Sequence, residues 1–250
     1  MKIDLHTHGK LSKKVEFSLE YFLDMINKAK ENELDAIALT EHFNTHRFAD
    51  VYDTLDREFP YMNDYYEVEG MKVFPGMEVD IQEIGHILLI GRREDIFDLR
   101  EKLEPYTMKG QFIPFKLLLE EASQYELLKI GAHPFRETTP LHHIDRTLLS
   151  QLDAFDLNGK DLFEQGVAEN SDKVLPFAKA MGLPVVGGSD THQSIQYGCI
   201  VNKFQDECAT IDELKRNIIE GRYEIDISPN LIEKVAAAKK MKKMLKAARN

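Results

Sequence analysis

Residues 2–8 of the chain read KIDLHTH, a short apolar run that passes directly into two histidines. In an extended segment alternate residues point to the same side, so Asp4, His6 and His8 face one way. The two imidazoles can then converge on one cation. The spacing D-x-H-x-H therefore predicts a first strand whose carboxyl end carries metal ligands.

Short apolar runs that end at polar residues recur along the chain. Rich in Ile, Val and Leu, they are typical of strands buried on both faces, which are parallel. The runs are 2–5, 34–39, 71–77, 127–132, 154–157 and 183–188, with another at 86–90 that begins with its histidine. Helical patterns lie between them, at 19–30, 48–59, 96–103, 115–122, 165–181 and 211–220. This alternation predicts an α/β fold with a parallel sheet closed into a barrel.

Side chains able to bind a metal gather at the predicted strand ends, the face on which α/β barrels carry their chemistry. They are His6, His8, His42, His86, His133 and His192, with the carboxylates of Glu78 and Asp190. Such a nitrogen and oxygen donor set exceeds what one tetrahedral zinc needs, so we expect two or three ions. The other three of the nine histidines, His46, His142 and His143, are predicted to lie in loops or on the surface.

Composition narrows the class of protein. The chain has 250 residues, a formal charge of −11 and 43% hydrophobic residues, which excludes disorder as the dominant state and suits one barrel domain. Cys199 and Cys208 are too few for a disulfide scaffold or a cysteine-based zinc module. The acidity argues against a general nucleic-acid surface. No signal peptide or membrane-spanning run is recognisable, so we expect a cytoplasmic protein without a membrane partner.

The end of the chain differs from the rest. Residues 231–250 carry seven Lys or Arg and one Glu, whereas residues 1–230 have a net charge of −17 (25 basic minus 42 acidic). We predict a barrel domain over 1–228 and a basic C-terminal helix over 229–250, packed on the barrel or extending from it. Its apolar stripe would consist of Leu231, Val235, Ala238, Met241, Leu245 and Ala248. Contact with nucleic acid or an acidic partner is the alternative role.

In order along the chain, D-x-H-x-H, T-E-H, G-M-E, H-I-L-L, H-P-F-R and G-S-D-T-H resemble the motifs of the PHP family, named for polymerase and histidinol phosphatase. The resemblance implies a distorted (β/α)7 barrel with up to three metal ions at the carboxyl ends of the strands. It implies a first ion on His6, His8, Glu78 and Asp190. It implies a second on Glu78, as a bridge, with His86 and His133, and a third that involves His42 and His192.

One motif departs from the family pattern. Family members commonly have Ser-Asp-Gly after D-x-H-x-H, whereas this chain has Ser12-Lys13-Lys14. A protonated lysine cannot coordinate a metal. The third site is therefore expected to be weak or empty, unless Glu16 or water substitutes, and Lys13 can place its charge there instead. Glu41, where the family commonly has Asp, is a candidate partner for a ligand.

The function implied is a metal-dependent phosphoesterase acting on a small phosphorylated metabolite or nucleotide, by attack of a hydroxide that bridges two metals. Arg136 would stabilise the phosphoryl charge, His192 would protonate the leaving oxygen, and Lys13 would hold a phosphate. The metals suited to these ligands are Zn, Mn or Fe. Two alternatives remain open: an amidohydrolase-like enzyme that cleaves C–N or C–O bonds on the same centre, and a non-catalytic metal-binding protein that serves a partner.

Overall fold

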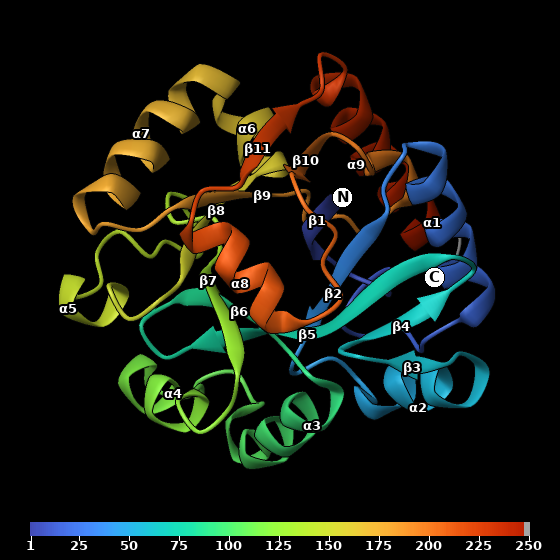
Figure 1. Ribbon diagram of the computed structural model, residues 1–250, viewed down its shortest axis with the longest axis horizontal. Helices are drawn as coiled ribbons and strands as arrows, with labels where there is room; N and C mark the ends of the chain where they lie inside the picture. Colours follow the sequence, from blue (N-terminus) through green and yellow to red (C-terminus); the bar gives the residue numbers. More distant parts are fainter. Residues whose placement is uncertain (248–250) are drawn as a thin grey trace.

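Seven strands form a ring in the computed structural model, which describes residues 1–247 (Figure 1). Backbone contacts between His8 and Thr191 join the last strand of the ring to the first, with the amide of His8 3.0 Å from the carbonyl oxygen of Thr191. In ring order the strands are β1 (Lys2–Thr7), β2 (Ala36–His42), β5 (Met71–Ile81), β6 (Gly85–Gly91), β7 (Leu127–Gly131), β8 (Ala154–Asn158) and β9 (Val185–Gly188). The α/β barrel predicted from the sequence is thus confirmed.

The prediction that all these strands are parallel is wrong for β6, which is antiparallel to both β5 and β7. Only residues 82–84 separate β5 from β6. Two neighbouring parallel strands need a crossover connection of about a dozen residues or more. A connection of three residues can therefore only form a hairpin. Because β6 runs backwards, its first residues lie at the same end of the barrel as the last residues of its neighbours. His86 consequently reaches the centre from the start of its strand.

Within residues 1–247, four further strands lie outside the ring and were not predicted. β10 (Ile200–Phe204) pairs antiparallel with β1, and β11 (Tyr223–Ile227) extends the sheet beyond it. β3 (Tyr61–Met62) and β4 (Tyr65–Val68) form a hairpin on β5. These strands add further antiparallel pairs to a sheet that β6 already makes mixed, next to β1 and β5.

The helices surround the ring, as Figure 1 shows. The helix predicted at 165–181 corresponds to Val167–Ala180, and a further helix that was not predicted, Gly159–Gln165, precedes it. The two are separated by Gly166, whose φ of 95° is readily adopted only by glycine. Ser18 caps the first helix by accepting a hydrogen bond from the amide of Tyr21. The helices are α1 (Leu19–Glu31), α2 (Ala49–Glu58), α3 (Arg93–Lys102), α4 (Phe115–Ala122), α5 (Arg146–Leu149), α6 (Gly159–Gln165), α7 (Val167–Ala180), α8 (Ile211–Ile219) and α9 (Leu231–Ala247), with 3₁₀ turns η1 (Glu104–Tyr106) and η2 (Ser194–Gln196).

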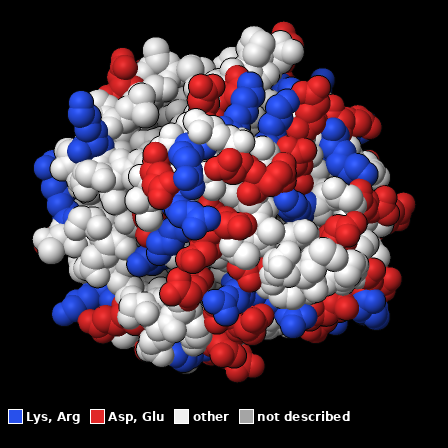
Figure 2. Space-filling model, viewed as in Figure 1, with Lys and Arg blue, Asp and Glu red and all other residues white. Residues whose placement is uncertain are grey.

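Helix α8 closes one end of the barrel, and Figure 1 shows it lying across the middle of the ring. Its Ile211, Leu214 and Ile218 are buried in one apolar cluster with interior residues near the starts of the strands, such as Ile3 and Leu128. On this face acidic and basic side chains are interspersed, without a large area of one sign (Figure 2). Because α8 fills the end of the barrel where the strands start, the candidate metal ligands at the carboxyl ends of the strands lie at the opposite end.

The basic helix α9 begins on the barrel. Leu231 and Val235 are buried in a cluster with residues of β8, β10 and α6, and Ala238 is also buried. The stripe predicted for this helix does not continue as a buried face, because Met241 and Leu245 are 41% and 37% exposed. Ala248 lies outside the described residues. Within residues 1–247, no helix has the length and apolar character needed to cross a membrane.

Candidate metal centre

The carboxylate of Glu78, buried near the middle of β5, is surrounded by five histidines. Its Oε2 lies 2.6 Å from Nδ1 of His42 and 3.6 Å from Nε2 of His8. Its Oε1 faces the other three: Nδ1 of His86 at 2.6 Å, Nε2 of His133 at 3.3 Å and Nε2 of His6 at 3.6 Å. A carboxylate with imidazoles at both oxygens is placed to bridge two cations.

All eight residues predicted as metal ligands lie together at one end of the barrel. Within each of three groups the candidate ligand atoms all lie within 4.8 Å of one another. The groups are His6, His8 and Asp190; Glu78, His86 and His133; and His8, His42 and His192. His8 belongs to two groups, so the first and third share a side chain.

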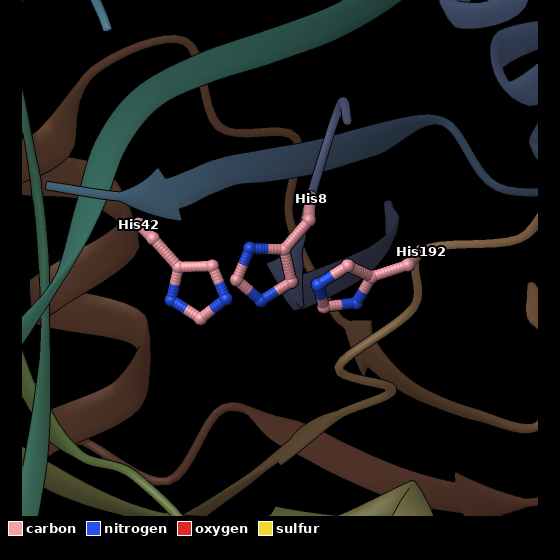
Figure 3. A group of neighbouring side chains, drawn as sticks. All are labelled: His8, His42 and His192. Atoms are coloured by element: carbon pink, nitrogen blue, oxygen red, sulfur yellow. The ribbon is translucent and has the colours of Figure 1, made fainter. Parts of the chain in front are cut away.

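The third group consists of imidazoles alone. Figure 3 shows His8, His42 and His192 with their rings side by side, on the ends of β1, β2 and the segment after β9. The ring centroid of His8 is 4.4 Å from that of His42 and 4.1 Å from that of His192. Burial lowers the pKa of His42 to about 4, against the opposing effect of the Glu78 carboxylate. His42 is therefore neutral near pH 7, the form that binds a metal.

Unusual backbone geometry positions two of the candidate ligands. His133 and Asp190 have positive φ angles of 33° and 55°, a region that costs residues other than glycine about 1–3 kcal/mol. The amide of Asp190 donates to the carbonyl oxygen of His6 at 2.8 Å, which ties the two ligand segments together. Gly188 permits this approach, because a Cβ there would lie 2.5 Å from Cβ of His6. Such strain is common at functional sites.

The donor set fits divalent cations, as its unpaired atoms show. In the described part of the chain, most of the buried side-chain nitrogens and oxygens without a hydrogen-bond partner lie in this centre. They are Oδ2 of Asp4, Nε2 of His6, Nδ1 and Nε2 of His8, Nδ1 of His42, Oε2 of Glu78 and Oδ1 of Asp156. Nδ1 of His42 and Oε2 of Glu78 lie 2.6 Å apart, but without the geometry of a hydrogen bond. A buried polar atom without a partner is costly, so a cluster of them in a folded protein calls for an explanation. Coordination of metal ions would supply one for the atoms of His6, His8, His42 and Glu78, which belong to the three groups of candidate ligands.

The charges point the same way. Burial by itself would lower the pKa of His6, but the carboxylates of Asp190, Asp156 and Glu78 raise it to about 10. A buried imidazole that retains a proton so strongly reports a local excess of negative charge. A bound cation would neutralise that charge.

The family model of the PHP domain matches residues 4–230. The chain belongs to the PHP domain family. Membership implies divalent metal ions at the clusters described above. No curated protein gave a sequence match.

Solved structures resemble the whole PHP domain. PsfC from Pseudomonas syringae PB-5123 has a TM-score of 0.76 at 21% identity, over 98% of each chain. The lesion-specific endonuclease PfuEndoQ from Pyrococcus furiosus has a TM-score of 0.64 at 21% identity, and the match covers 90% of this chain but 57% of the endonuclease. A protein assigned as a metal-dependent phosphoesterase from Bifidobacterium adolescentis has a TM-score of 0.53 at 12% identity, over 87% of this chain and 95% of that one. At these identities the likeness concerns the fold.

Around the centre of this PHP domain, carboxylates contact the outer nitrogens of the ligand imidazoles. Oδ2 of Asp156 lies 2.9 Å from Nδ1 of His6, and Glu41 lies 3.8 Å from Nδ1 of His8. Glu41 was predicted to be such a partner, whereas Asp156 was missed. Its signal was available: Asp156 and Asn158 alternate at the end of β8 as Asp4 and His6 do at the end of β1. Carboxylates in this position fix the tautomer and orientation of a ligating histidine.

Lys13 lies at the edge of the centre. Its Nζ is 2.8 Å from Oδ2 of Asp80, whose other oxygen is 3.0 Å from Nε2 of His86. The lysine is thus paired beside the group of Glu78, His86 and His133. Glu16, considered as a substitute ligand for the third ion, is instead 70% exposed and faces Arg47 at 3.5 Å.

Two basic side chains contact Asp190, and one of them is held in turn by a second carboxylate. Nη1 of Arg136 lies 3.0 Å from Oδ2 of Asp190, and Nζ of Lys160 lies 2.6 Å from Oδ1. Asp161 in turn binds Arg136 at 2.7 Å. Arg136 was predicted, but Lys160 and Asp161 were missed, since their sequence surroundings resemble an ordinary amphipathic helix. His46, His142 and His143 are exposed and lie outside the centre, as expected.

Proposed function

We propose that this chain is a metal-dependent phosphoesterase that hydrolyses a small phosphorylated metabolite or nucleotide. The observation that carries the proposal is the position of Glu78 between two groups of imidazoles, with the cations of Arg136 and Lys160 at the adjoining carboxylate. A bridging carboxylate suits a centre of two ions, and phosphoryl oxygens need positive charge in the transition state. The PHP family and the phosphoesterase neighbour support hydrolase activity.

The residues take separate roles in this proposal. His6, His8 and Asp190 would hold one ion and His86 and His133 a second, with Glu78 between them, while His42 and His192 would contribute to a weaker third site with His8. Bound divalent ions, of Zn, Mn or Fe, would act as Lewis acids toward the phosphoryl group and the attacking water. Glu78 orients the two ligand groups through its contacts with five imidazoles.

Two further side chains complete the proposed chemistry. His192, which is buried beside His8 in the third group, would donate a proton to the leaving oxygen when it binds no metal. Lys13, 35% exposed, can contact an anionic group of the substrate at the opposite edge. In these roles Lys13 supplies positive charge near the phosphoryl group, and His192 supplies a proton where negative charge develops on the leaving oxygen.

The test is hydrolysis by the purified protein loaded separately with Zn, Mn and Fe. The substrates are p-nitrophenyl phosphate, bis-p-nitrophenyl phosphate, and an amide and a lactone for comparison. We expect phosphoester hydrolysis that a chelator abolishes, with no action on the amide or the lactone. His6→Ala should remove the activity, whereas His143→Ala, which changes an exposed histidine, should retain it. If no metal supports phosphoester hydrolysis, the proposal is wrong.

The other outcomes separate the alternatives. Hydrolysis of the amide or lactone would indicate an amidohydrolase-like enzyme. Fewer than two bound ions per chain, with no hydrolysis of any substrate, would indicate a metal-binding protein without catalysis. Metal analysis of the same preparations distinguishes this last case from an enzyme with an untested substrate class.

A polynucleotide substrate is the second candidate, favoured by the position of α9. This basic helix packs against α6 and η2, the turn that follows His192, and its Lys239 lies 2.7 Å from Glu164 of α6. The neighbour PfuEndoQ is an endonuclease. The test is cleavage and binding of end-labelled oligonucleotides. Binding that weakens steeply with salt and is reduced by the triple variant Lys239→Glu, Lys240→Glu and Lys243→Glu would support this substrate.

A further inference from the structure

Asp190 is contacted by two cations that approach different oxygens. Nζ of Lys160 lies 2.6 Å from Oδ1, and Nη1 of Arg136 lies 3.0 Å from Oδ2. Oδ1 is also the oxygen that faces the metal-binding imidazoles, at 3.4 Å from Nε2 of His8 and 3.9 Å from Nε2 of His6. Lys160 therefore binds the atom that a metal ion in this group would use, whereas Arg136 binds the other one.

The two cations differ in how firmly they are held. Asp161, which is 2% exposed, accepts hydrogen bonds from Nε of Arg136 at 3.2 Å and from Nη2 at 2.7 Å. Asn158 accepts from the same Nη2 at 3.0 Å. These contacts fix the planar guanidinium, so that only Nη1 points to Asp190. Arg136 can remain in this place when Oδ1 of Asp190 binds another group.

Lys160 is held less firmly, because among residues 1–247 its ammonium group pairs with Asp190 alone. It reaches Asp190 through a flexible chain that is 23% exposed, from the first turn of α6. A divalent ion held by His6, His8 and Asp190 needs the lone pairs of Oδ1 and repels an ammonium group at hydrogen-bond distance. The ammonium of Lys160 must then move to another anion on the solvent side of the centre.

We propose that Lys160 is a phosphoryl-binding residue, which exchanges Asp190 for the anionic oxygens of the substrate when the metal is bound, and that Arg136 is a positioning residue for Asp190. The proposal rests on the proposed phosphoesterase function and assigns the direct contact with phosphate to Lys160 rather than to Arg136. In the absence of metal Lys160 neutralises Asp190; in its presence the same charge becomes available to the substrate.

The two residues should affect metal binding in opposite directions. Lys160→Met removes a competing and repelling cation, so we expect the dissociation constant for the divalent ion, measured by competition with a chromophoric chelator, to fall by about tenfold. Arg136→Lys loses the planar fork that orients Asp190, and we expect that constant to rise by about tenfold. Arg136→Lys is used instead of an uncharged variant, because it keeps a cation beside the buried Asp161.

Phosphate binding is the second measurement. Inorganic phosphate should bind the metal-loaded Lys160→Met variant about tenfold more weakly than the wild type by calorimetry, and Lys160→Arg should recover most of the affinity. Lys173→Met, on the exposed face of α7, is the control and should change neither constant. Thermal unfolding of each variant checks that it is folded.

The outcomes are decisive for the proposal. Unchanged or weaker metal binding in Lys160→Met, or phosphate binding equal to that of the wild type, would overturn it. Neither measurement requires turnover. A wild-type protein that binds phosphate in this way but hydrolyses no phosphoester would contradict the proposed function and leave the assignment of Lys160 intact.

Discussion

Oδ2 of Asp156 lies 2.9 Å from Nδ1 of His6, and both side chains are buried. The contact joins the ends of β8 and β1, which flank β9 in the ring. It occupies the outer nitrogen of the imidazole and leaves Nε2 directed toward Glu78 and Asp190. Asp156 thereby determines which nitrogen of His6 is offered to a metal.

Replacing Asp156 with Asn should weaken metal binding without removing a ligand. The amide keeps the size of the side chain but loses the charge that makes the imidazole a better donor. Mutation of a carboxylate that orients a ligating histidine typically lowers metal affinity or activity by about 10–100-fold. We expect a loss in that range, measured as the dissociation constant of the divalent ion.

Asp226→Asn on the outer strand β11 is the matched control, because Asp226 is half exposed and pairs with Lys203. It should leave the metal affinity unchanged. Equal metal affinities in Asp156→Asn and the wild type would show that Asp156 only supports packing.

Glu78→Gln should reduce the number of bound ions. The carboxamide has one donor oxygen in place of two and carries no charge, so it cannot bridge two cations. We expect the metal content to fall from at least two ions per chain to one or fewer, by elemental analysis. Phosphoesterase activity should fall by more than about 100-fold, beyond the loss typical of residues that only orient a ligand.

Glu67→Gln, an exposed change on β4, controls for the loss of one acidic residue. Two ions retained by the Glu78→Gln variant would mean that the two groups of imidazoles bind metal independently of the bridge.

The strand ends could be predicted from sequence because each signal is local. An apolar run followed by His or by His and Asp identifies the end of a buried strand, and parallel strands place their ends on one face. This reasoning located Glu78 and the six histidines that the structure brings together. The reversal of β6 was also readable, since the eight residues between the predicted runs 71–77 and 86–90 are too few to connect parallel neighbours.

The outer residues of the centre could not be found in the same way. Asp156 is separated from His6 by 150 residues, and Lys160 from Asp190 by 30. Nothing in the local sequence of Lys160 distinguishes it from a lysine in an exposed ion pair, and the alternation of Asp156 with Asn158 does not by itself show that Asp156 faces a ligand. They contact the ligands only because the closed barrel brings segments distant in sequence together, and this closure is a property of the whole sheet.

Glu213 gives the fold a measurable dependence on pH. Its carboxylate accepts hydrogen bonds from the amides of Ala209 at 2.7 Å and Thr210 at 3.1 Å, at the start of α8. These amide donors lower the pKa of Glu213 below its ordinary value of 4.5. A carboxylate with a lowered pKa in the folded state stabilises that state above pH 4.5, and this contribution is lost as the pH falls through the folded-state pKa.

Glu213→Gln should therefore be less stable than the wild type at pH 7 by about 0.3–1 kcal/mol, the usual value of a charge at a helix start. The difference should shrink as the pH falls below 4.5. Thr210→Ala removes an uncharged cap, so its cost of about 1 kcal/mol should persist on both sides of that pH. Urea unfolding at a series of pH values measures both, and a constant offset for Glu213→Gln would contradict the role of its charge.

The last prediction concerns the attachment of α9, and two neighbouring residues test it. Leu231 is 1% exposed in an apolar cluster with Leu157 and Ile200, whereas Ile232 is 48% exposed. Leu231→Ala should lower the free energy of unfolding of the whole barrel by about 2–5 kcal/mol, because it leaves a cavity between α9 and the sheet. Ile232→Ala should change that free energy by less than about 0.5 kcal/mol. Similar effects of the two changes, by urea unfolding, would show that α9 does not unfold cooperatively with the barrel.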